Sequence, residues 1–146
     1  AQGAYYRFEQ RNLVSFVKTA PYTPPLGEKE EKAVKISEVI SMLGLEVYVE
    51  GDGEREIKGV ITGDLLSFIM AEAMEDWLWV TIQVHLNVAA VAVLKDVPLI
   101  ITASGRKPGK DLEDRCRIEG ISLAGATASA YEVAGRLWEA GLGKLK

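Results

Sequence analysis

The sequence predicts a three-layer α/β fold with a mostly parallel sheet and helices on both faces. The main observation is the stretch 77–105, WLWVTIQVHLNVAAVAVLKDVPLIITASG, in which two apolar runs flank a compact apolar segment, Val88–Leu94. The order strand, loop, helix, loop, strand joins parallel strands through a right-handed crossover. Strands that are apolar almost throughout are typical of sheets whose two faces are covered by helices.

The chain before this stretch continues the alternation. Apolar residues at helical spacing predict a helix from Val34 to Leu43, with Gly44 as its C-terminal cap. Strands are expected over Leu45–Glu50 and Ile57–Thr62, and Asp64 is placed to cap the next helix. The apolar face of that helix is expected to comprise Leu65, Leu66, Ile69 and Met70.

Three more elements follow the central stretch. Pro108 favours the first turn of a helix that ends at Glu119-Gly120, and Ile121–Ala124 is a short strand. Ser129 and Glu132 form a capping box before the last helix, with Glu132 reaching back to the cap. The apolar positions of these two helices are Leu112, Cys116, Ile118, Val133, Leu137, Trp138 and Leu142.

Composition favours one soluble domain with an additional arm. The chain has 146 residues, of which 48% are hydrophobic and 26% charged, with a formal net charge of -4. Periodicity starts at Val34, so we expect a single α/β domain over 34–146 and an N-terminal arm or linker over 1–33. The arm is rich in aromatic residues and prolines, and it is either a remnant of an upstream segment or a docking element.

Charge and cysteine content exclude several classes of function. No basic stripe is present, so nucleic acid is not an expected partner. No apolar segment reaches the roughly 20 residues that span a bilayer. The single cysteine, Cys116, rules out a disulfide framework and fits a cytoplasmic protein.

Polar residues follow each of the four predicted parallel strands. The carboxyl ends of such strands share one edge of the sheet, where open α/β sheets bind ligands and where helix N-termini favour anions. The expected ligand contacts at this edge are Thr62, Asp64, Gln83, His85, Asn87, Thr102, Ser104, Gly105 and Thr127.

None of these residues forms a recognisable catalytic or metal-binding set. His85 is the only histidine, with Gln83 and Asn87 as its polar neighbours, and we expect it to make ordinary loop hydrogen bonds or to contact a ligand. Asn87 is also placed to cap the helix from Val88. We therefore predict no catalytic residue, no metal and no cofactor.

The segment Thr102–Lys110 has only part of a phosphate-binding loop. Three residues rather than four separate Gly105 from Gly109, and Asp111 follows Lys110 where Ser or Thr is required. A nucleotide-hydrolysing site is therefore rejected. The weaker alternative is that the backbone amides near Ser104 and Gly105, together with Arg106 and Lys107, hold an anion, and a flexible surface turn is at least as good an interpretation.

Four segments of the chain carry a family resemblance, and they are Gly63–Ser67, Trp79–Val88, Ile100–Pro108 and Ser129–Leu137. They resemble the DRTGG-domain family, and the likeness covers Val34 to Leu142. The chain is similar to the regulatory middle segment of long phosphotransacetylases and, more distantly, to the N-terminal domain of HPr kinase. The name-giving motif differs, because Gln83–Asn87 and Thr102–Gly105 stand in its place.

This resemblance implies an HPr-kinase-N-terminal-like α/β module that accompanies enzymes or CBS domains and has no activity of its own. The leading hypothesis is a non-catalytic regulatory module that binds a small ligand, such as an anion or a nucleotide, or a partner protein at the strand-end loops. The alternative is a structural or assembly subunit that forms a homodimer or docks on a partner enzyme. In that case the arm, the Val88–Val93 helix or Trp138 would mediate the contact.

Overall fold

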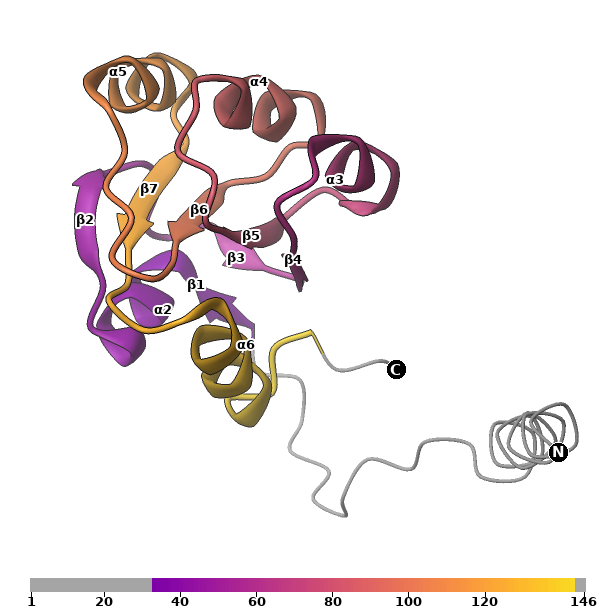
Figure 1. Cartoon of the computed structure of the whole chain (residues 1–146). Coiled ribbons are helices and arrows are strands. Elements are labelled where there is room, and N and C mark those ends of the chain that lie inside the picture. Colours follow the sequence, from indigo (N-terminus) through magenta and orange to yellow (C-terminus); the bar gives the residue numbers. More distant parts are fainter. Residues whose placement is uncertain (1–32, 144–146) are drawn as a thin grey trace, which may run out of the picture. The chain divides into compact units, whose positions relative to one another are not determined.

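The computed structural model describes residues 33–143, which form a mixed α/β sandwich with one central sheet (Figure 1). The sheet has five strands, and the order across it is β2, β7, β6, β5, β4. The strands are β2 (Glu46–Val49), β7 (Ser122–Gly125), β6 (Leu99–Thr102), β5 (Trp77–Thr81) and β4 (Gly59–Thr62). Neighbours from β4 to β7 run parallel, and β2 pairs antiparallel with β7 at the far edge. The predicted fold class is therefore confirmed.

Five helices cover the two faces of the sheet. They are α2 (Ile36–Leu43), α3 (Leu66–Glu72), α4 (Asn87–Leu94), α5 (Lys110–Glu119) and α6 (Ala130–Glu139). Figure 1 shows α3, α4 and α5 on one face and α2 with α6 on the other. Each face has its own apolar core, and the strands supply alternate residues to the two cores, as a parallel sheet buried on both sides requires.

The small-residue helix α4 is packed against the sheet. Its residues Val88, Ala89, Val91 and Ala92 are buried, because small side chains let the helix axis approach the strands closely. The buried side of α4, which the sequence offered as a possible dimer contact, thus packs within the domain core. Cys116, on α5, is also buried in this core, as its helical position predicted.

One predicted strand is divided in two. Residues Glu56–Ile57 form β3, which pairs antiparallel with β1 (Val34–Lys35), whereas Gly59 begins β4. Lys58 separates them, because its amide donates to Asp76 O at 2.9 Å instead of joining either ladder. The prediction of one continuous strand from Ile57 to Thr62 was therefore wrong, and the predicted helix from Val34 begins only at Ile36.

Other local predictions hold with small shifts. Gly44 ends α2 in the left-handed conformation at φ 59°, as a glycine cap does. The predicted apolar faces are too wide, because Leu65, Met70, Ile118 and Trp138 are all substantially exposed. Except for Ala33, the predicted N-terminal arm (1–33) lies outside the described residues, so the division into arm and domain stays a prediction.

Candidate functional site

The four loops predicted to share one edge of the sheet lie together at the carboxyl ends of β4, β5, β6 and β7. The registers align Thr62 with Val80, Thr81 with Thr102, and Thr102 with Gly125, so the strands end at nearly the same level. Parallel pairing of these four strands therefore places every loop that carries a predicted contact on this edge.

Asp64 connects the first two of these loops. Its Oδ1 accepts hydrogen bonds from the Thr81 hydroxyl at 2.9 Å and from the Ile82 amide at 2.8 Å. Gln83 Nε2 donates to the Asp64 carbonyl at 3.2 Å. The sequence predicted that Asp64 caps α3, and this prediction was wrong. Leu65 holds the cap position without a side-chain bond, because the carboxylate turns toward β5 instead.

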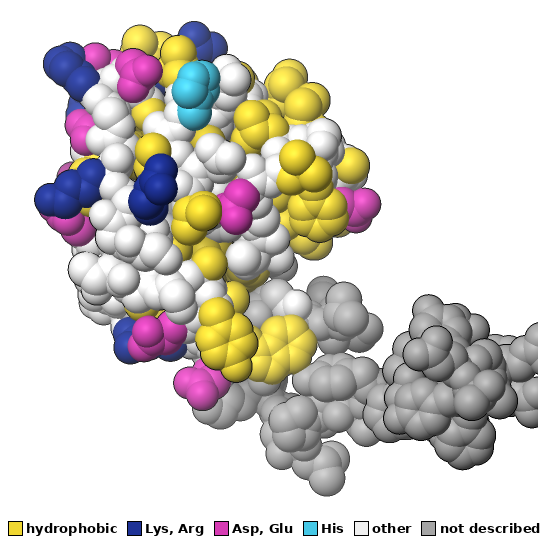
Figure 2. Space-filling view, in the orientation of Figure 1, with side chains coloured by type: hydrophobic (Ala, Val, Ile, Leu, Met, Phe, Trp, Pro, Cys, Tyr) yellow, Lys and Arg dark blue, Asp and Glu magenta, His cyan; other side chains and the backbone are white. Residues whose placement is uncertain are grey.

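His85 takes the capping role that the sequence assigned to Asn87. The imidazole Nδ1 accepts the Asn87 amide at 3.1 Å, and Asn87 is the first residue of α4. The fold thus uses Nδ1, and the second ring nitrogen, Nε2, is left available to a ligand. Figure 2 shows this ring, the only histidine, at the molecular surface.

The next loop is less accessible than the sequence suggested. Thr102 is fully buried, and its hydroxyl faces Ala124 O at 3.5 Å. The amides of Ser104 and Gly105 donate to Ala128 O at 2.7 Å and to Ala126 O at 2.9 Å. These bonds join the β6–α5 loop to the β7–α6 loop. The hypothesis that the two amides hold an anion is therefore wrong, because their hydrogens are already used.

A pocket of about 240 Å³ is lined by the β7–α6 loop, the end of α2 and helix α6. Thr127 is the predicted contact that lines it. The remaining lining residues, which the sequence analysis did not single out as contacts, are Leu43, Gly44, Ala126, Ala128, Glu132 and Arg136. They come from the end of α2, the β7–α6 loop and helix α6, so the pocket joins α2 to segments distant from it in sequence. Glu132 and Arg136 are four residues apart, a spacing that predicts an ion pair on one face of a helix but gives no indication of a pocket.

The first turn of α6 forms one wall of this pocket. Ser129 Oγ accepts the Glu132 amide at 3.2 Å, so the predicted N-cap is confirmed. Glu132 does not reach back to complete a capping box. Its carboxylate instead accepts from Arg136 Nη2 at 2.7 Å, one helical turn further on. The guanidinium retains other N–H groups that can bind an anion.

Several polar side chains at the edge have no hydrogen bond within residues 33–143. They are exposed and belong to Thr62, Asn87, Ser104 and Thr127. Together with the Nε2 of His85, they present donors and acceptors that a ligand can use without displacing a bond of the fold. Hydroxyl, amide and imidazole groups of this kind bind and orient ligands.

The described residues contain no cluster suited to a metal and no activated thiol. No group of three or more His, Cys, Asp or Glu side chains within 33–143 is arranged to hold a metal ion. Burial raises the pKa of the Cys116 thiol to about 11, so the neighbouring arginines do not activate it. No helix in the same range is long and apolar enough to cross a membrane.

Comparison with solved structures finds a regulatory region of which about half resembles this fold. The chain is similar to the CBS and DRTGG domains of the regulatory region of Clostridium perfringens pyrophosphatase, in a crystal structure complexed with the activator diadenosine tetraphosphate. The TM-score is 0.63 at 12% sequence identity, over 85% of this chain and 54% of that one. The present chain thus spans about half the length of its structural neighbour.

The resemblance to the DRTGG-domain family that the sequence predicted is confirmed for the fold. No model of a protein family and no curated protein matches the sequence.

Proposed function

We propose that the domain is a non-catalytic regulatory module that binds a small ligand at the carboxyl edge of β4–β7. The observation that carries this proposal is the pocket beside Thr127, which lies at the carboxyl end of β7, the edge where parallel sheets bind ligands, and whose lining includes the polar side chains of Thr127, Glu132 and Arg136. The fold similarity to a regulatory region crystallised with a nucleotide activator supports it.

The pocket volume favours a small or partly inserted ligand. Pockets for drug-sized molecules measure about 300–1,000 Å³, and the cavity here is about 240 Å³. A phosphate group or a ribose would fit inside. A complete nucleotide would extend out of the pocket along the edge, toward the hydroxyl of Ser104. Arg136 lines the pocket beside its partner Glu132, and the guanidinium N–H groups that Glu132 does not use are the donors proposed for an anionic group of the ligand.

The remaining contacts divide into two groups in this proposal. Thr127, Ser104 and Arg136 lie around the pocket and the loop next to it. Thr62, His85 and Asn87 lie at the β4–β5 end of the edge and contact a ligand only if it extends that far. Thr102 is left out because it is buried, and Asp64 because its carboxylate is bonded to β5.

Absence of catalysis is part of the proposal. The exposed groups at the edge include no activated nucleophile and no acid–base pair, so a reaction would lack the residues that carry proton or group transfer. Binding without chemistry is the role of a sensor. A homodimer, a partner enzyme and a cytoplasmic location stay predictions from the sequence.

A thermal-shift screen tests the proposal. The full chain is heated with adenine nucleotides, cyclic dinucleotides, acyl phosphates and simple anions. A ligand present at 100 times its dissociation constant adds about 2.7 kcal/mol to the free energy of unfolding, which raises the melting temperature clearly. The proposal expects at least one phosphorylated compound to produce such a shift. A flat panel at millimolar concentrations would contradict it.

A further inference from the structure

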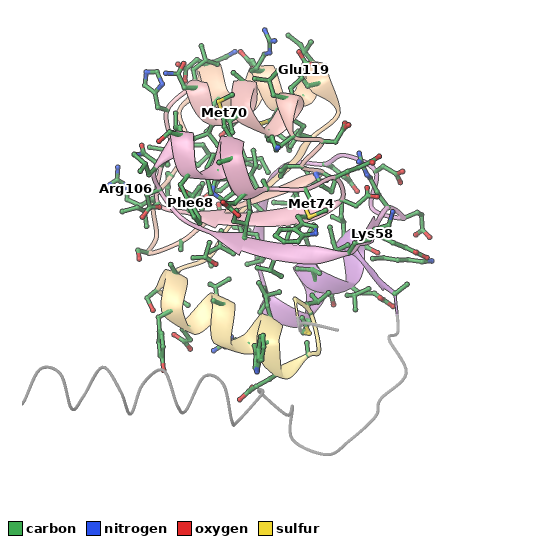
Figure 3. The ribbon with its side chains drawn as sticks, turned by 90° about the vertical axis from the view of Figure 1, so that its right-hand side faces the viewer. Lys58, Phe68, Met70, Met74, Arg106 and Glu119 are labelled. Atoms are coloured by element: carbon green, nitrogen blue, oxygen red, sulfur yellow. The ribbon has the colours of Figure 1, made fainter. Side chains whose placement is uncertain are left out.

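An apolar strip made by α3, the α3–β5 loop and the start of β5 lies beside edge strand β4. It consists of Phe68, Met74 and Trp77. Phe68 is 46% exposed and Met74 60% exposed, and the Trp77 side chain is half-buried. Figure 3 shows Phe68 and Met74 on the β4 side of α3, whereas Met70 lies on the side toward α4.

Close contacts with two glycines fix the ends of the strip. The Trp77 indole covers Gly59, so that any side chain added there would overlap the ring. At the other end, a methyl group added at Gly63 would lie 3.3 Å from the Phe68 ring. The strip therefore follows the whole length of β4, from Gly59 to Gly63. Figure 2 shows hydrophobic side chains gathered over the α3 side of the domain.

The surroundings of the strip are acidic. Residues 59–94 contain no Lys or Arg. Glu72 lies one helical turn after Phe68 and Glu75 follows Met74; both are exposed, and neither forms an ion pair within residues 33–143. The nearest cation in sequence, Lys58, is held by Asp76, with 2.8 Å between Nζ and Oδ2. Glu75 also interacts electrostatically with Lys58, whereas Glu72 has no ion pair within residues 33–143, so the strip combines apolar surface with a mildly acidic border.

We propose that the strip docks a peptide segment of a partner protein that carries large apolar side chains flanked by Lys or Arg. The charge is complementary to such a segment. A second copy of this chain is disfavoured, because a two-fold contact would bring the acidic borders of two strips together. This binding surface is separate from the ligand pocket, so it stands or falls independently of the proposed ligand.

The area of the strip also favours a peptide segment. A large apolar side chain has about 200 Å² of surface, and about half of Phe68 and Met74 but a smaller part of Trp77 is exposed, which gives roughly 250 Å². A standard interface buries about 800 Å² on each partner. The strip is thus too small to hold a dimer by itself and large enough for two or three anchoring side chains.

The test measures binding of two synthetic amphipathic peptides to the full chain by fluorescence polarisation. The peptides share their apolar residues and differ only in carrying Lys or Glu at the polar positions. We expect the Lys peptide to bind and the Glu peptide to bind at least tenfold more weakly. Raising the salt concentration should weaken binding of the Lys peptide, because the attracting carboxylates are exposed.

Two pairs of substitutions locate the binding. The double substitution Phe68→Ser with Met74→Ser should lower the affinity for the Lys peptide at least tenfold. The double substitution Glu72→Lys with Glu75→Lys should lower it by a similar factor. The second pair is fully on the surface and keeps the test valid if the first pair unfolds the domain. Ile118→Ser, at a residue 79% exposed on α5, is the apolar control and should leave binding unchanged.

A matched charge control separates docking from general attraction. Glu50→Lys with Glu113→Lys changes the net charge equally at the β2 side of the sheet, far from α3. Equal weakening by this pair and by the Glu72 and Glu75 pair would overturn the proposal, and so would unchanged binding to the Phe68 and Met74 variant. Conversion of a dimer to a monomer by Phe68→Ser with Met74→Ser would also overturn it, and would assign the strip to a second copy.

Discussion

The two ends of β4 and β5 use polar residues in opposite ways. At the amino ends, charged groups neutralise one another. Asp76 accepts from Arg55 Nε at 2.8 Å and pairs with Lys58 Nζ at 2.8 Å, while its amide donates to Asp96 O at 3.1 Å. At the carboxyl ends, several hydroxyl and amide side chains have no hydrogen-bond partner among the described residues, 33–143. The amino ends are thus organised for stability, and the carboxyl ends present groups available for binding.

Asp64 is the exception at the carboxyl end, and its removal should have the largest effect on stability. Asp64→Ala leaves the buried Thr81 hydroxyl and the Ile82 amide without their acceptor, which we expect to cost about 2 kcal/mol of unfolding free energy. Asp64→Asn keeps one oxygen acceptor and should cost less. Urea denaturation measures both. Equal stability of the alanine variant and the wild type would show that Asp64 does not hold the edge together.

At the amino end, Asp76 should confer a stability that depends on pH. Its pKa is lowered, mainly by the hydrogen bond with Lys58 and also by Arg55. A lowered pKa in the folded state means that this stabilisation is present above the unfolded pKa of about 4 and is lost as the pH falls through the folded pKa. Asp76→Asn should therefore cost about 1 kcal/mol at pH 7 and progressively less below pH 4.

Thermal unfolding of Asp76→Asn from pH 7 to pH 3 checks that dependence. Asparagine tolerates the positive φ of 64° at this position, so the substitution changes the charge rather than the backbone. If the difference in melting temperature between this variant and the wild type stayed constant down to pH 3, the carboxylate charge would not be the source of the stabilisation.

His85 should contribute less to stability, through the start of α4. His85→Ala removes the acceptor of the Asn87 amide and should cost roughly 0.5 kcal/mol, the low end for the loss of a helix cap, because the imidazole is exposed. His85→Asn offers a side-chain oxygen at the same place and should recover most of the loss. Melting temperatures of the two variants give the comparison. If both lose stability equally, the cap is not what the imidazole provides.

The smallest stability effect is expected for the groups proposed to bind. Thr127→Val and Thr62→Val each replace an exposed hydroxyl that has no hydrogen bond within residues 33–143, so each should change the unfolding free energy by less than about 0.5 kcal/mol. Calorimetry of the two variants measures this directly. A larger loss at either position would mean that its hydroxyl supports the fold.

Much of the sheet could be predicted because its signals are local. Apolar runs such as Leu99–Thr102, followed by polar loops, identify strands, and parallel pairing then fixes the common edge. The cap at Gly44 and the burial of Cys116 follow from a left-handed terminus and from helical spacing. These features depend on neighbours in sequence and need no knowledge of distant residues.

The details of the candidate site could not be predicted, because they depend on contacts between distant segments. Asp64 is a good helix cap by sequence, yet Thr81 and Ile82, 17 and 18 residues away, compete for its carboxylate. The amides of Ser104 and Gly105 are taken by carbonyls of the β7–α6 loop. The pocket itself joins Gly44 at the end of α2 to Arg136 on α6, two positions that no sequence pattern links.

The central claim, that a small ligand binds at the pocket beside Thr127, is tested most directly by the thermal shift of three proteins. They are the wild type, Thr127→Val with Arg136→Gln, and His85→Asn with Asn87→Ala. For any compound that stabilises the wild type, the account predicts that the shift disappears in the first variant and largely persists in the second. A shift that survives in the first variant and disappears in the second would contradict the account and move the site to the β5–α4 loop.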